Sequence, residues 1–169
     1  MRIAEVYSLI CLDSWSHPWD SLASVLPGIT QEAAAWACPA YADDIETPAD
    51  WPKPGSILWQ LNHILACKAG YTSVLRAMDH DADADTPPLH DLAQLKAALA
   101  SAGEAYITAL LERSDEDFAR VIGRDLTLRA FIDSNLRHEI WHAGQIAVLK
   151  RLYRSATAAS ISPVGHESD

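Results

Sequence analysis

Two histidines, His138 and His142, stand four residues apart in a stretch with helical periodicity. Residues at this spacing lie one turn apart on the same face of an α-helix, so both imidazoles can reach one divalent metal ion. A third histidine, His63, lies far upstream in the apolar stretch Trp59-Gln-Leu-Asn-His-Ile-Leu65. The pattern predicts a metal site of His63, His138 and His142 between two helices. Neutral imidazoles bind Zn²⁺, Ni²⁺, Fe²⁺ or Mn²⁺.

Other polar residues accompany the two histidines of the last helix. Asn135 and Gln145 continue their stripe at spacings of three, and leucines resume on both sides. Buried polar groups need partners, so we expect these two residues to support the ligands or to orient a substrate. Glu139 lies about 100° around the helix from His138. It is a candidate catalytic base for metal-bound water, beside Gln145, or else a solvated residue.

Alternatives to this site remain open at the level of sequence. The histidine pair could belong to a buried hydrogen-bond network without metal. Cys67 follows His63 by four residues and could be a fourth ligand, although a small buried hydrophobe is the commoner role of a free cysteine. The motif His138-Glu-Ile-Trp-His142 also fits the H-E-x-x-H pattern of zinc peptidases. That function usually needs a third ligand downstream, where only His166 and Glu167 are available.

The composition is that of one ordinary globular domain. The chain has 169 residues, of which 49% are hydrophobic, and a net charge of −10. The acidic balance argues against nucleic acid as a partner. The three cysteines show no paired spacing, and no signal-peptide pattern is evident, which favours the cytoplasm. No run of 18 apolar residues exists, so we expect no membrane span.

Helical periodicity dominates the chain and predicts an all-α fold. A domain is expected over residues 1–155, followed by a flexible tail over residues 156–169. Thr30, Ser56 and Thr127 are expected N-caps. A proline-rich loop is expected over residues 38–55, an acidic loop over 79–88 and a connector over 114–124. The expected helices cover residues 15–26, 30–36, 56–78, 89–113 and 127–153.

The His63 stretch and the motif His138-Glu-Ile-Trp-His-Ala-Gly-Gln-Ile146 together resemble the DinB-like (DinB/YfiT) superfamily over about residues 14–154. The resemblance implies a four-helix bundle with a long crossover loop. It implies that His63, on the second helix, and the pair His138 and His142, on the last helix, are the metal ligands. It also implies a homodimer, a small-molecule substrate and, by analogy with characterised members, a low-molecular-weight thiol as cofactor.

Three functions are compatible with these features. The first is a metal-dependent enzyme, either a thiol-dependent transferase or a hydrolase. The second is an H-E-x-x-H zinc peptidase, which would leave His63 without a role. The third is a non-catalytic protein in which the metal only staples the helices together. An open coordination position beside a cleft favours the enzyme, whereas a closed site with Cys67 as fourth ligand favours the staple.

Overall fold

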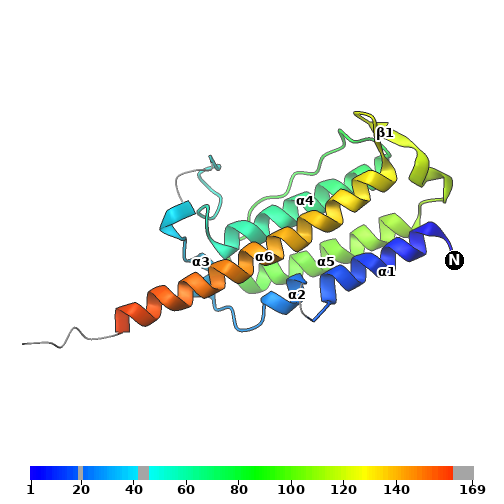
Figure 1. The fold of residues 1–169 in the computed structure, drawn as a ribbon. Coiled ribbons are helices and arrows are strands. Elements are labelled where there is room, and N and C mark those ends of the chain that lie inside the picture. The colour runs from blue at the N-terminus through cyan, green and yellow to red at the C-terminus, as the bar shows by residue number, and fades with distance from the viewer. Residues whose placement is uncertain (19–20, 42–45, 162–169) are drawn as a thin grey trace, which may run out of the picture.

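Four long helices lie side by side and form most of the molecule (Figure 1). The computed structural model describes residues 1–18, 21–41 and 46–161. The all-α prediction is confirmed. The α-helices of the described residues are α1 (Ile3–Ser16), α2 (Leu22–Val25), α3 (Gln31–Ala35), α4 (Ile57–Ala77), α5 (Leu92–Leu111) and α6 (Leu128–Ile161). Short 3₁₀ turns cover Pro39–Tyr41 and Glu116–Ala119, and the strands β1 (Val121–Gly123) and β2 (Leu126–Thr127) form a hairpin.

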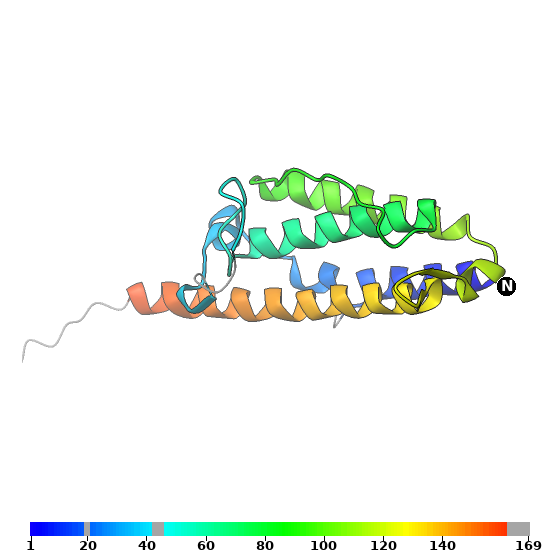
Figure 2. The same cartoon turned by 90° about the horizontal axis from the view of Figure 1, so that it is seen from above.

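The bundle brings α4 into contact with both α5 and α6, and α1 packs against the same two helices. Two apolar clusters fill the core. One lies towards the start of α4 and includes Leu61, Leu99 and Ile146, and the other includes Leu75 and Ile132. Figure 2 shows α6 running along the whole bundle and past the ends of the other helices. Within the described ranges, no helix is both long and apolar enough to cross a membrane.

The helices begin at capping residues that the sequence identifies. The hydroxyls of Thr30, Ser56 and Thr127 each accept a hydrogen bond from the backbone N–H three residues later, at 3.1–3.2 Å. Each bond satisfies one of the free donors of a helix N-terminus. Asp91 caps α5 in the same way. The predicted α4 and α6 therefore begin where the sequence placed them.

The predicted helix over residues 15–26 is wrong. A longer helix, α1, precedes it and ends at Ser16, just before His17-Pro18. A residue that precedes proline avoids the helical region, and His17 is extended, with ψ of 134°. The proline therefore ends one helix instead of opening another. Ser21 then caps the single turn α2.

The last helix is also longer than the sequence indicated. It continues beyond Tyr153 to Ile161, so residues 156–161 are helical and not part of a flexible tail. The alanines of Ser155-Ala-Thr-Ala-Ala159 explain this extension, because alanine has the highest intrinsic helix propensity. Residues 162–169 of the expected tail lie outside the described residues.

Asn62 fixes the segment that leads from α4 to α5. Its side chain is 2% exposed. Its Nδ2 donates to the carbonyls of Leu58 and Leu89 at 2.9 and 2.8 Å, and its Oδ1 accepts from the N–H of Leu89 at 2.7 Å. Two of these three hydrogen bonds tie Leu89, directly after the acidic loop, to α4 at the residue before His63, and the third holds the amide against its own helix.

Replacing Asn62 with Ala should therefore destabilise the protein by about 2 kcal/mol, because the N–H of Leu89 loses its partner. Urea denaturation followed by circular dichroism would measure the free energy of unfolding. Gln94→Ala, at an exposed position of α5, is the control and should change stability by less than about 0.5 kcal/mol. Equal effects of the two substitutions would refute this role of Asn62.

Candidate metal centre

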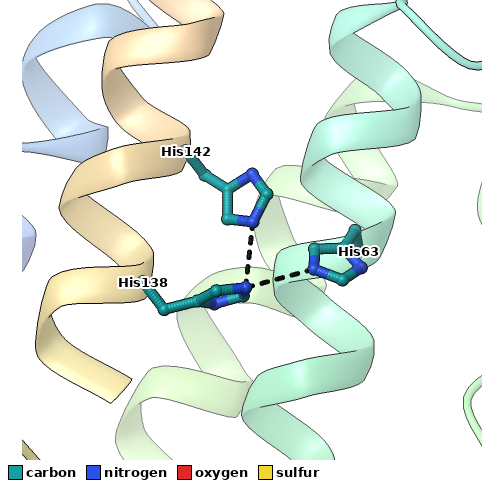
Figure 3. A group of neighbouring side chains, drawn as sticks. All are labelled: His63, His138 and His142. Carbon is teal, nitrogen blue, oxygen red and sulfur yellow. Dashed lines mark hydrogen bonds between the residues drawn. The ribbon is translucent and has the colours of Figure 1, made fainter. Parts of the chain in front are cut away.

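The three predicted histidines meet between α4 and α6. Figure 3 shows His63 facing His138 and His142 across the gap between these helices. The Nε2 atom of His138 lies 3.2 Å from Nε2 of His63 and 3.0 Å from Nε2 of His142. One ligand atom from each ring lies within 4.8 Å of the other two. The structure thus brings together residues that are up to 79 positions apart in the sequence.

This arrangement fits a divalent transition metal. Nitrogens bound about 2.1 Å from one ion lie about 3.0–3.4 Å apart, for angles between a right angle and a tetrahedral angle. The two short separations at His138 agree with that range. Three nitrogens pointing at one another repel unless a cation or shared protons lie between them. The donor set, neutral imidazole nitrogen, is one that first-row divalent ions accept.

Hydrogen bonds to the far sides of the rings orient them. The Nδ1 atom of His142 lies 2.5 Å from Oε1 of Gln60, which can only accept, so Nδ1 carries the proton and the lone pair of Nε2 is free. The hydroxyl of Tyr71 lies 3.3 Å from Nδ1 of His138. The indole ring of Trp59 stacks on His63 with a centroid distance of 5.4 Å. Hydrogen-bond partners of this kind fix the tautomer and the ring position of metal-binding histidines, and the stacked indole restricts the position of the His63 ring.

Burial keeps the three imidazoles neutral. It is the largest cause that lowers the pKa of each ring. The neighbouring rings of His138 and His63 add to it at His142, because a second positive charge nearby is unfavourable, and together these causes bring the pKa of His142 to about 4. At neutral pH, protons therefore compete only weakly for these nitrogens, and the lone pairs are available to a metal.

Cys67 lies beside the three histidines. Its Sγ is 3.5 Å from Nε2 of His63, one turn along α4. Burial raises the pKa of its thiol, so it is protonated at neutral pH in this environment. Among the described residues, the possible ligand atoms that all lie within 4.8 Å of one another belong to the three histidines. Cys67 is not part of this group.

The other predicted site residues lie in two different places. Gln145 lines a cavity of about 640 Å³ together with His63 and His142, and Trp59 and Trp141 form part of its wall. Glu139 instead forms an ion pair with Lys68 and lines a second cavity. Asn135 also faces that second cavity, and its Nδ2 donates to the hydroxyl of Tyr106 at 3.5 Å. Gln145 therefore accompanies the histidines, whereas Glu139 and Asn135 point to another side of α6.

Sequence reasoning missed Gln60 and Tyr71. Both lie on α4, Gln60 one turn before His63 and Tyr71 two turns after it. Helical spacing alone places them near the face of His63, which was an available signal. Their partners, His142 and His138, are on a different helix, and this pairing depends on the register between α4 and α6.

Replacing Gln60 with Leu should weaken metal binding about 10- to 100-fold, because Nδ1 of His142 loses the acceptor that sets its tautomer. Competition with a chromophoric chelator would measure the affinity, and circular dichroism would check helical content. Gln94→Leu provides a matched exposed control that should bind metal like the wild type. An unchanged affinity in the folded Gln60 variant would contradict the proposed orientation of His142.

Comparison with known proteins agrees with these features. The family model described as the DinB superfamily matches residues 15–146, a range that contains all three histidines. Neither the curated proteins nor the solved structures gave a match. The matched range covers most of the chain and includes the bundle helices α4, α5 and the part of α6 that carries His138 and His142. The chain therefore belongs to the DinB superfamily.

Proposed function

We propose that this protein is a metal-dependent enzyme, a thiol-dependent transferase or a hydrolase acting on a small molecule. The observation that carries the proposal is the cavity of about 640 Å³ beside His63 and His142. A metal held by the three histidines would lie beside this cavity, which offers room for water or substrate. A divalent ion bound there would lower the pKa of a water molecule or thiol and so supply a nucleophile.

The residues of the chain have distinct tasks in this proposal. The three histidines hold the ion, and Gln60 and Tyr71 hold two of their rings. Gln145 orients the substrate: its Oε1 is buried and makes no hydrogen bond of good geometry among the described residues, although its side chain lies near enough to His142 to raise the pKa of that ring. Such a group is costly to leave unpaired, so an occupant of the cavity that donates to it would be stabilised.

The walls of this cavity favour an uncharged substrate with an apolar part. Besides the histidines and the two glutamines, the described lining consists of apolar side chains and glycines, and it contains no lysine, arginine, aspartate or glutamate. A thiol cofactor that carries carboxylates would find its countercharge only at the metal. The lining therefore does not favour a thiol-dependent transferase over a hydrolase, and the proposal includes both.

The position of Glu139 bears on its proposed role and on the peptidase alternative. In an H-E-x-x-H peptidase the glutamate acts as the base at the metal. Here its carboxylate is bound to Lys68. His63 also supplies the third ligand from α4, and the downstream candidates His166 and Glu167 lie outside the described residues. The geometry thus favours the three-histidine enzyme over the peptidase, and Glu139 as a catalytic base stays a prediction.

The second candidate function is non-catalytic: the metal only holds α4 and α6 together. The specific observation in its favour is Cys67, whose sulfur lies 3.5 Å from Nε2 of His63. A thiolate at this position would close the coordination sphere and neutralise part of the metal charge. The two candidates therefore differ in whether Cys67 or an exchangeable water completes the site.

Metal content and coordination separate the two candidates. We expect one ion per chain in protein purified without added metal, and the Co²⁺-substituted protein should lack a thiolate-to-cobalt absorption band. Cys67→Ala should retain the ion, whereas His142→Ala should lose it with little change in helical content. The staple would be supported by a thiolate band that disappears in Cys67→Ala.

Turnover should be tested with several low-molecular-weight thiols and electrophilic acceptors, and with small uncharged esters and amides. Gly144 lines the cavity, and a Cβ at this position would meet no atom within 4 Å. Gly144→Leu should therefore reduce turnover by filling the cavity while metal content stays unchanged. If the metal-loaded protein has an open coordination position but turns over neither substrate class, the enzyme proposal is refuted.

We also propose that the protein is a homodimer. Three large apolar side chains of α1, Leu9, Ile10 and Leu12, are exposed, and a partner surface that covers them would remove apolar area from water. Size-exclusion chromatography with light scattering at micromolar concentration should give about twice the chain mass of 18.5 kDa. A single species at the mass of one chain would refute the dimer.

A further inference from the structure

A second cavity, of about 430 Å³, lies on a different side of the bundle from the metal centre. The helices α1, α4, α5 and α6 all contribute to its wall, and it shares no lining residue with the cavity beside His63 and His142. It has the size and the mostly apolar wall of a small-molecule site. No function proposed above involves this cavity.

A buried ion pair lies in the wall of this cavity. Lys68 is 5% exposed, and its ammonium group contacts Oε1 of Glu139. The same nitrogen lies 4.7 Å from the ring centre of Trp15 and 5.5 Å from that of Tyr106. A buried ion pair contributes little to stability compared with apolar residues of the same volume, so stability alone does not explain it. The carboxylate and the two ring faces already surround the charge of Lys68.

A glycine in the middle of α5 keeps the cavity open. Gly103 lines the cavity, and a glycine inside a helix costs about 1 kcal/mol relative to alanine. Close packing against another element often explains such a residue, but a Cβ at Gly103 would meet no atom within 4 Å. Its backbone angles also do not require glycine. A side chain at this position would instead occupy space that belongs to the cavity.

We propose that this cavity binds a small organic amine with an apolar body. Its charged lining residues are Lys68, Glu139 and Glu104, so two carboxylates face one ammonium group that is already paired. Glu139 meets Lys68 through Oε1, and its second oxygen can accept a hydrogen bond from a ligand. Glu104, exposed at the rim, attracts a cation. The apolar body of the ligand lies along Trp15, Ile107 and Leu136.

Three probes with one skeleton test the charge preference: 4-phenylbutylamine, 4-phenylbutanol and 4-phenylbutyrate. Isothermal titration calorimetry with the full chain should show the amine binding tightest and the carboxylate weakest. Glu104→Gln should weaken binding of the amine about three- to fivefold, since rim charges contribute modestly, and leave the alcohol unchanged. Equal binding of all three probes, tighter binding of the carboxylate, or binding of none would overturn the proposal.

Two matched glycine substitutions test whether the amine binds in this second cavity. Gly103→Leu should weaken amine binding about tenfold or more by filling the cavity. Gly144→Leu makes the same change at a mid-helix glycine of the other cavity and should leave amine binding unchanged. Ala100→Leu, on the same wall as Gly103, is a second blocking variant should Gly103→Leu fail to fold. Loss of binding in Gly144→Leu alone would place the amine at the metal centre and refute the second site.

Discussion

The separation and register of α4 and α6 at His63, His138 and His142 decide whether the three imidazoles can share one ion. Three ring nitrogens can share one ion only if the two helices hold them within a few tenths of an ångström of the required separation. The apolar clusters above and below this level set that separation, one through Leu61 and Ile146 and the other through Leu75 and Ile132. The core therefore positions the three histidines, which occupy a polar layer between the two apolar clusters.

That polar layer extends across the bundle. On α6, the polar residues from Asn135 to Gln145 separate the two apolar clusters, and on α4 His63 and Lys68 occupy the corresponding level. One side of the layer holds imidazoles and the other holds the ion pair of Lys68 with Glu139. Each side borders its own cavity. Except for Oε1 of Gln145, these polar groups have partners, and they are grouped beside spaces that small molecules can enter.

Local patterns made much of this arrangement predictable. The spacing of His138 and His142 predicted one helical face, and Ser56 and Thr127 marked the starts of the two helices that carry the ligands. These features depend on residues within a few positions of each other. The bundle itself followed from the resemblance to a family, which the family match then confirmed.

The features that the sequence did not reveal depend on contacts between distant segments. Nothing local in the sequence pairs Lys68 with Glu139, which as a single residue is a candidate base, until the bundle buries the two side chains together. Gln60 gained its role from His142, which lies 82 positions away. The helix α1 escaped prediction because its buried side is formed by small and mixed residues such as Ala4, Ser8 and Cys11, and not by a stripe of large apolar ones.

One continuous helix carries a histidine of the candidate metal centre and the carboxylate of the second cavity at adjacent positions, His138 and Glu139. These two side chains project about 100° apart from a rigid cylinder. A small rotation of α6 about its axis that moves one of them towards its partner moves the other away from its own. The packing that fixes the rotation of α6 at His138 therefore also fixes the position of the Glu139 carboxylate in the wall of the second cavity.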